Sequence, residues 1–119
     1  ITAVYTLDQV KKIFRCLNKK TKSIISIFAG RMADKGKDPI PVFKKSILIT
    51  KKYRNIEVLW ASTREPYNFL QAKDLNCNII TMPPNIINKI SDFGKSYKML
   101  TIDTVKGFLN DSKKSKFKI

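Results

Sequence analysis

The sequence predicts an α/β protein built on a parallel β-sheet, and two observations predict it. Four short runs rich in apolar and β-branched residues, at 1–5, 23–29, 56–61 and 78–82, have the composition of strands. Each run is followed by a segment whose apolar residues recur at helical spacing. Repeated strand–helix alternation gives a parallel sheet with right-handed crossovers. Four such strands make either a small doubly wound sheet or half of a closed (β/α)8 barrel.

The predicted helices begin at recognisable capping patterns. Thr6 and Gln9 stand in a capping-box spacing, and Val10, Ile13 and Leu17 then share one helical face. Prolines, which suit the first turn of a helix, are expected to begin the three later helices: Pro39 with Pro41, Pro66, and Pro83 with Pro84. A last helix is expected to be capped by Thr101, and the tail from residue 111 is expected to fray.

The chain is strongly basic, with a net charge of +15 in 119 residues. Such a charge points first to a nucleic-acid partner. However, 20 of the 24 basic residues are lysine, whereas base readout and bidentate phosphate contacts favour arginine. We interpret the charge as a solvated lysine-rich surface and keep a basic nucleic-acid-associated domain as an alternative. No apolar run is long enough to cross a membrane, so no membrane partner is expected.

The cysteines and the lack of histidine narrow the chemistry further. Cys16 and Cys77 are isolated in the sequence, and we interpret both as small core residues of a protein in a reducing, cytoplasmic compartment. Without histidine or paired cysteines, neither a transition-metal site nor a Ser-His triad is expected. No strand leads into a Gly-x-Gly-x-x-Gly turn or a Walker-type loop, which removes the main support for a nucleotide-binding fold.

Two strands end in the same way. "SIISIFAGR" and "VLWASTR" each run from apolar residues through small residues to an arginine, Arg31 and Arg64. In an α/β barrel the carboxyl ends of the strands carry the chemistry, so both guanidinium groups are expected over one mouth, with Ser62 between them. Two guanidinium forks and a hydroxyl suit a phosphate monoester dianion. The alternative is a pair of surface ion pairs, Arg31 with Asp34 and Arg64 with Glu65.

Five stretches carry a resemblance to a known family: "ITAVYTLDQV", "SIISIFAGRMADKGKDP", "LWASTREPYNFLQA", "CNIITMPPNIINKI" and "TIDTVKGFLND". Together they resemble the C-terminal half of transaldolases and of the related fructose-6-phosphate aldolases. The motifs Phe-x-Gly-Arg and Ala-Ser-x-Arg are specific when they occur in this order. The resemblance covers residues 1–111 and implies the fifth to eighth βα units of a (β/α)8 barrel with its terminal helix, followed by a basic tail at 112–119.

The resemblance also implies residue roles. Thr2 resembles the fifth-strand threonine that orients a catalytic water during Schiff-base steps, and Ser26 resembles the sixth-strand serine near the substrate hydroxyls. Phe28 occupies a position where transaldolases commonly carry phenylalanine and the aldolase branch carries tyrosine, which favours a transaldolase. The family's phosphate-binding group matches the residues that the strand ends already indicate: Arg31, Ser62 and Arg64. Asp34 matches an acidic residue to which we assign no role.

One departure from the family is large. Its nucleophilic lysine lies on the fourth strand and its acid/base aspartate on the first, and neither strand is expected here. The full protein would transfer a dihydroxyacetone unit between sugar phosphates through a lysine Schiff base, without a metal or organic cofactor, and this chain alone is expected to be inactive. A fructose-6-phosphate aldolase-type enzyme and a non-catalytic sugar-phosphate-binding module are the alternatives closest to this reading.

The chain begins directly inside the first predicted strand. We therefore expect a fragment, a cleaved product or one piece of a split barrel. A half barrel exposes two sheet edges and part of an apolar face. The expected partners are a sugar-phosphate substrate and either the missing N-terminal half barrel or a second copy of the chain, so the chain alone should be poorly soluble or oligomeric.

Overall fold

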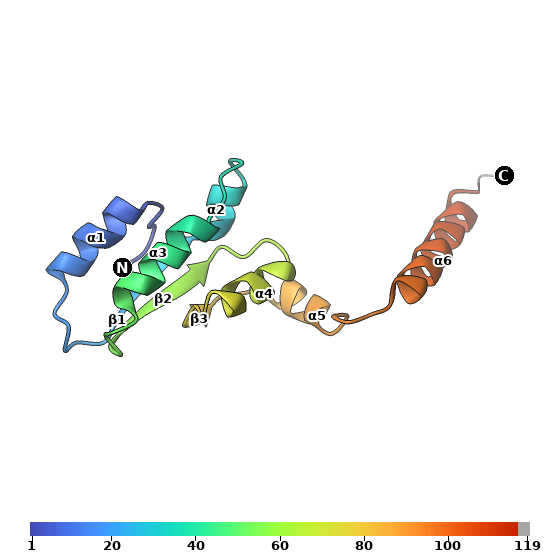
Figure 1. The fold of residues 1–119 in the computed structure, drawn as a ribbon. Coiled ribbons are helices and arrows are strands. Elements are labelled where there is room, and N and C mark those ends of the chain that lie inside the picture. The colour runs from blue at the N-terminus through green and yellow to red at the C-terminus, as the bar shows by residue number, and fades with distance from the viewer. Residues whose placement is uncertain (117–119) are drawn as a thin grey trace. The chain divides into compact units, whose positions relative to one another are not determined.

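The structure, a computed structural model, describes residues 1–116, in which one or two helices separate successive strands (Figure 1). The strands are β1 (Ser23–Phe28), β2 (Ile56–Ala61) and β3 (Ile79–Ile80). The helices are α1 (Leu7–Cys16), α2 (Ala29–Ala33), α3 (Ile40–Thr50), α4 (Tyr67–Asp74), α5 (Pro84–Ile90) and α6 (Tyr97–Ser115). The predicted α/β class is confirmed, although β3 is shorter than the strand expected at 78–82.

The strands form one parallel sheet in the order β1-β2-β3. Ser23 pairs with Ile56 and Phe28 pairs with Ala61, so β1 and β2 begin and end level with each other. A parallel sheet with helices between its strands is consistent with part of a (β/α)8 barrel. The level ends place the segments after β1 and β2 at the same edge of the sheet.

The expected first strand is present only as a short parallel contact with β1, which includes a bridge from Val4. The backbone N–H of Ser26 donates to the carbonyl of Ile1 at 2.8 Å, and the N–H of Val4 donates to the carbonyl of Ser26 at 3.3 Å. Thr2 and Ala3 therefore both lie opposite Ser26, which is a β-bulge. Ala3 has a φ of +58°, in the left-handed region. The bulge interrupts the ladder, so no regular strand forms before α1.

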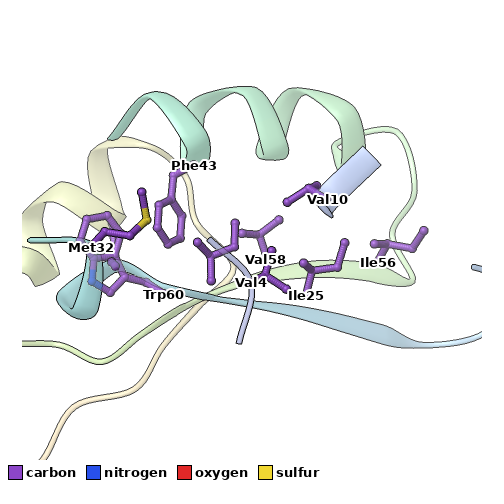
Figure 2. Packing of buried hydrophobic residues seen from close by; sticks show 11 residues of the cluster. Val4, Val10, Ile25, Met32, Phe43, Ile56, Val58 and Trp60 are labelled. Carbon is purple, nitrogen blue, oxygen red and sulfur yellow. The ribbon is translucent and has the colours of Figure 1, made fainter. Parts of the chain in front are cut away.

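Helices α1 and α3 cover one face of the sheet. Figure 2 shows Val10 of α1 and Phe43 of α3 on the same side of the strands as Val58, and the ring of Phe43 stacks on Trp60 with 4.5 Å between centroids. The residues of β1 and β2 that face these helices are at most 2 % exposed: Ile25, Ile27, Ile56, Val58 and Trp60. Burial of these apolar side chains is the main term that stabilises the sheet.

The opposite face of the sheet is only half-buried. Ile24, Ser26 and Phe28 alternate with the buried residues of β1, and Leu59 lies in register beside Ser26. The apolar composition of the strands predicts burial on both faces, and in the described part of the chain only the helix-covered face is fully buried. Ser26 and Phe28 lie on the open face together, as their shared strand parity predicts.

The capping box predicted at the start of the first helix is confirmed. The hydroxyl of Thr6 accepts a hydrogen bond from the Gln9 N–H at 3.2 Å. The Gln9 side-chain carbonyl in turn accepts from the Thr6 N–H at 3.0 Å, so each residue satisfies a backbone donor of the other. This reciprocal cap fixes where α1 begins.

The last helix begins earlier and continues further than predicted. Ser96 caps it by accepting a hydrogen bond from the backbone of the first turn, whereas Thr101 lies inside α6 and donates its hydroxyl to a carbonyl of the preceding turn. The helix continues to Ser115, so residues 111–115 are helical rather than frayed. Lys116 is the C-cap of this helix, and residues 117–119 of the predicted tail lie outside the described residues.

The chain divides into two compact units, Ile1–Lys89 and Ile90–Ile119. The first unit contains the sheet and the hydrophobic core. In the second unit, Lys95 and Asp103 form an ion pair at 2.6 Å, which raises the pKa of the lysine and lowers that of the carboxyl group. Among the described helices, none has both the length and the apolar character that a membrane span requires.

The two cysteines differ in burial. Cys77 packs against the core, and burial raises the pKa of its thiol, whose Sγ lies 3.2 Å from the carbonyl oxygen of Val58. Cys16 is exposed at the end of α1. The prediction that both cysteines are core residues is therefore wrong for Cys16, because the apolar face of α1 does not include the last residue of the helix.

Candidate functional site

The ends of β1 and β2 are in direct backbone contact at Gly30. A Cβ built on Gly30 would lie 1.5 Å from the carbonyl oxygen of Ser62 and 2.9 Å from Cγ of Arg64. Because both distances are shorter than any normal contact, only glycine allows the chain after β1 to approach the chain after β2 this closely. In the structure, Gly30 brings the two strand ends together.

The segment that carries Arg64 turns sharply after β2 and is fixed by a neighbouring helix. Ser62 has a φ of +63°, a left-handed conformation that non-glycine residues adopt infrequently and that is often found at functional sites. The side-chain carbonyl of Asn68, in α4, accepts hydrogen bonds from the backbone N–H groups of Arg64 at 3.0 Å and Glu65 at 3.1 Å. The backbone of Arg64 is thereby held by α4.

The guanidinium group of Arg64 binds the carboxylate of Asp34, the residue that ends α2. Nε of Arg64 lies 3.1 Å from Oδ1 and 3.2 Å from Oδ2, and Nη2 lies 2.7 Å from Oδ2. These hydrogen bonds lower the pKa of Asp34 and raise the pKa of Arg64. Since both side chains are about half exposed, the pair adds little to stability, and its main effect is to orient Arg64.

This pairing differs from the alternative in which each arginine forms an ion pair with a carboxylate close to it in the sequence. Asp34 pairs with Arg64 and not with Arg31, and the partner of Arg64 is not the adjacent Glu65. In the part of the chain that the structure describes, Arg31 forms no ion pair. The simple picture of two local surface ion pairs is therefore wrong, because the pair that Arg64 forms links the segments that follow two different strands.

Arg31 is exposed in α2 and is held by an aromatic ring instead of a carboxylate. Its guanidinium carbon lies 5.3 Å from the ring centroid of Phe28, and Phe28 meets Tyr5 edge to face at 5.9 Å. A cation over an aromatic face is attracted by the ring quadrupole, which favours this position of Arg31. The side chain lines a cavity of about 430 Å³ together with Tyr5, Thr6, Met32, Lys35 and Lys37.

The structure brings two further predicted residues together on the other side of β1. The bulge places Thr2 opposite Ser26, and Ser26 shares the open face of the sheet with Phe28. Thr2 is exposed and Ser26 is half-buried. Bulges are common beside active sites, where they redirect a side chain. Thr2, Ser26 and Phe28 therefore lie on or beside β1, whereas the side chains of Arg31 and Arg64 line two different cavities.

A smaller cavity of about 250 Å³ lies after β2 and β3, and its lining includes Ser62, Thr63, Arg64, Thr81, Met82 and Pro83. Thr63 is 5 % exposed, and its hydroxyl donates to the carbonyl of Thr81 at 2.6 Å, which joins the ends of the two strands. Neither Thr63 nor Asn68 is among the site residues expected from the sequence. The partner of Thr63 is 18 residues away, which no local pattern marks, whereas Asn68 binds backbone groups only three and four residues before it.

The groups after β1 and β2 can bind an anion with hydroxyl groups. Lys35 and Lys37 line the cavity beside Arg31, but neither lies in a strand. None of the strands β1, β2 and β3 contains a lysine. Within residues 1–116, no three His, Cys, Asp or Glu side chains gather as metal ligands would. What the site offers is two guanidinium groups, the hydroxyls of Ser26 and Ser62, and an aromatic wall at Phe28.

Comparison with known proteins gives the same family as the sequence motifs. The family model described as "Transaldolase/Fructose-6-phosphate aldolase" matches residues 1–119. A "Probable transaldolase" of Myxococcus xanthus is 32% identical over 81% of this chain and 42% of its own length. Proteins with the same description from Nitrosopumilus maritimus and Kosmotoga olearia are each 30% identical, over 60% and 78% of this chain and 33% and 41% of their own lengths. The chain thus spans less than half the length of these relatives.

Proposed function

Because the chain belongs to the transaldolase/fructose-6-phosphate aldolase family, we propose that it supplies the phosphate-binding part of an enzyme that transfers a dihydroxyacetone unit between sugar phosphates. The phosphate of the sugar binds at the joined ends of β1 and β2. Arg31 and Arg64 donate hydrogen bonds to its oxygens, and the hydroxyl of Ser62 donates a further one. The alternative within the family is an aldolase-type reaction on the same substrate class.

The observation that carries this proposal is the contact of the two strand ends at Gly30. It places the segments bearing Arg31 and Arg64 side by side, at the carboxyl edge of a parallel sheet. In α/β barrels this edge carries the active site, and phosphate sites are common after the seventh and eighth strands. The resemblance to the family implies that β2 and β3 are the seventh and eighth strands, and the cavity that Ser62 and Arg64 line lies after them.

The carbon–carbon chemistry requires a lysine that the strands of this chain lack. A Schiff base forms when an unprotonated lysine amine attacks the ketose carbonyl and water leaves, which requires a depressed lysine pKa. We place this lysine, and the acid/base aspartate, on further strands of a longer polypeptide. In that enzyme Thr2 orients the water of the Schiff-base steps, Ser26 contacts the substrate hydroxyls and Phe28 forms the wall that favours transfer. No metal or organic cofactor takes part.

The test is borohydride trapping with fructose 6-phosphate, read by intact mass and peptide mapping. It is run on this chain alone and on the longest polypeptide that its source produces. We expect a reduced adduct only on the longer species, at a lysine outside this chain. In the longer species, Arg64→Ala should lower the yield of trapped adduct at low substrate concentration. A high substrate concentration should restore that yield. An adduct on a lysine of this chain would contradict the assignment of the chemistry to other strands.

A second candidate is a sugar-phosphate-binding module without catalysis, which the absence of lysine from the described strands favours. The same experiment separates the two. If the longest polypeptide binds fructose 6-phosphate but yields no trapped adduct, the protein is a binding module. If it yields an adduct and releases many equivalents of glyceraldehyde 3-phosphate per chain without an acceptor, the aldolase-type reaction is supported instead.

The open face of the sheet also requires a partner. Ile24, Phe28 and Leu59 leave it half-exposed, and apolar faces of this kind are usually covered by protein. We propose that further βα units of a longer polypeptide cover it, and that a second copy of the chain does so when those units are absent. Light scattering on the isolated chain should give an oligomer or aggregate, and a monodisperse monomer would contradict this. The free thiols suit a reducing, cytoplasmic setting.

A further inference from the structure

The structure assigns a role to Asp34, which the proposed function leaves without one. We infer that Asp34 is a positioning residue that holds Arg64 by one edge of its guanidinium group and leaves the other edge for the phosphate. The inference rests on the proposed phosphate site at Arg64. Two features support it: which nitrogen atoms the carboxylate occupies, and where in the fold the carboxylate comes from.

The atoms in the ion pair leave one edge of Arg64 open. Asp34 occupies Nε, at 3.1 Å and 3.2 Å, and Nη2, at 2.7 Å. Guanidinium presents donors in a planar fork, so a ligand can also bind across the edge formed by Nη1 and Nη2. Within residues 1–116, Nη1 of Arg64 has no hydrogen-bond partner. A phosphate dianion can therefore bind Arg64 without displacing Asp34.

The fold fixes the backbone of Asp34. Asp34 follows directly on the last residue of α2, and its backbone N–H donates to the carbonyl of Gly30 at 2.9 Å. Gly30 is in turn the residue whose backbone lies against Ser62 and the stem of Arg64. The backbones that carry the carboxylate and the guanidinium group thus meet at the same contact, at Gly30. In addition, Asn68 of α4 holds the Arg64 backbone. An arginine that is held before binding loses less freedom when the ligand arrives.

Removal of the negative charge of Asp34 distinguishes a role in positioning Arg64 from a purely electrostatic effect on the phosphate. A carboxylate beside a phosphate repels it, so charge removal alone should tighten phosphate binding. If Asp34 positions Arg64, Asp34→Asn should instead weaken binding. Glu65→Gln is the matched control, because it removes the same charge beside Arg64 and Glu65 is not paired with that guanidinium group. Asp34→Glu keeps the charge and the bidentate carboxylate and should restore binding.

The experiment measures the affinity of the longest natural polypeptide for inorganic phosphate by calorimetry, with four proteins: wild type, Asp34→Asn, Asp34→Glu and Glu65→Gln. We expect Asp34→Asn to bind about two- to fivefold more weakly than wild type, in line with an exposed ion pair. Glu65→Gln should bind as tightly as wild type or more tightly, and Asp34→Glu should lie within about twofold of wild type.

A second readout follows Arg64 without any phosphate. Phenylglyoxal reacts with accessible guanidinium groups, and peptide mapping gives the rate at each arginine. Asp34→Asn should speed the labelling of Arg64 and leave Arg15 and Arg54 unchanged. If wild type binds no phosphate, the proposed site and the role of Asp34 both fail. If wild type and Glu65→Gln bind phosphate and Asp34→Asn binds it as tightly as Glu65→Gln, only the positioning role is overturned.

Discussion

The ends of β1 and β2 have similar sequences and different electrostatic surroundings. Arg31 follows β1, lies over the ring of Phe28 and forms no ion pair in the described part of the chain. Arg64 follows β2 and is bound bidentately by Asp34. Both carry the same charge at the same edge of the sheet, yet one is positioned by an aromatic face and the other by a carboxylate.

The difference shows that a strand-end motif determines where an arginine lies but not what holds it. Arg31 can turn all its donors to a ligand, because a ring contact occupies the face of the guanidinium group and leaves its edges free. Arg64 keeps one edge for Asp34 and has only the other for a ligand. We therefore expect Arg64 to give direction to a bound phosphate and Arg31 to adapt to it.

The largest effect is expected where the two strand ends touch. In Gly30→Ala the new Cβ would overlap the carbonyl of Ser62, so the backbone after β1 or β2 must move. We expect a loss of about 3 kcal/mol in the free energy of unfolding, measured by urea denaturation with the fluorescence of Trp60. Gly107→Ala is the control: nothing lies near that Cβ and alanine is favoured inside a helix, so it should not lower the midpoint. An unaffected Gly30→Ala protein would contradict the close contact.

The next effect concerns the end of β2 alone. Thr63→Val keeps the shape of the side chain and removes the buried hydroxyl that donates to Thr81. The carbonyl of Thr81 then loses its partner, and the free energy of unfolding should fall by about 1 to 2 kcal/mol. The same urea titration measures it. Thr104→Val, which removes an exposed hydroxyl from α6, should change the midpoint little.

The comparison between the arginines is tested by exchanging each for lysine. Lysine keeps the charge but cannot bind a carboxylate and a phosphate by two separate edges. Arg64→Lys should weaken phosphate binding about tenfold, and Arg31→Lys about threefold, because only Arg64 depends on a fixed orientation. Calorimetry on the longest natural polypeptide gives both values. If Arg31→Lys costs more than Arg64→Lys, the roles inferred for the two strand ends are reversed.

The smallest effect is a pH dependence confined to one strand end. Arg64 lowers the pKa of Asp34 in the folded protein, so ionised Asp34 favours folding above its unfolded pKa, and this contribution is lost as the pH falls through the lowered folded value. The Asp34 carboxyl should therefore titrate below its usual range by NMR. In Arg64→Gln it should return toward that range. Equal titration in both proteins would show that the pair does not form in solution.

Much of this fold could be predicted from local patterns. Helical spacing and the Thr6–Gln9 capping box fix α1, and the apolar runs fix β1 and β2, because these signals depend on residues close in the sequence. The bulge at Ala3 could not be predicted, since it depends on where Ser26 places its backbone hydrogen bonds. The start of the last helix could not be fixed from the sequence, because Ser96 and Thr101 are both suited to an N-cap and only Ser96 serves as one.

Prediction of the site from the sequence also fails where a contact depends on residues that are distant in the chain. The two arginines and Ser62 stand out in the sequence, because each follows a strand. The partner of Arg64 does not, because Asp34 lies 30 residues away and reaches it only where α2 ends beside β2. Thr63 is likewise an ordinary polar residue until the fold brings Thr81 beside it. Strand endings can be read from the sequence, whereas the contacts that orient them depend on the assembled sheet.

One measurement tests most directly the claim that the two strand ends bind one phosphate together. The longest natural polypeptide is labelled with phenylglyoxal in the presence of fructose 6-phosphate, or of fructose as a control, and the labelling of each arginine is mapped. Fructose 6-phosphate should protect Arg31 and Arg64 from labelling at the same half-saturating concentration and leave Arg15 and Arg54 reactive. Fructose should protect neither Arg31 nor Arg64. Equal protection of all four arginines, or protection of Arg64 without Arg31, would contradict the account.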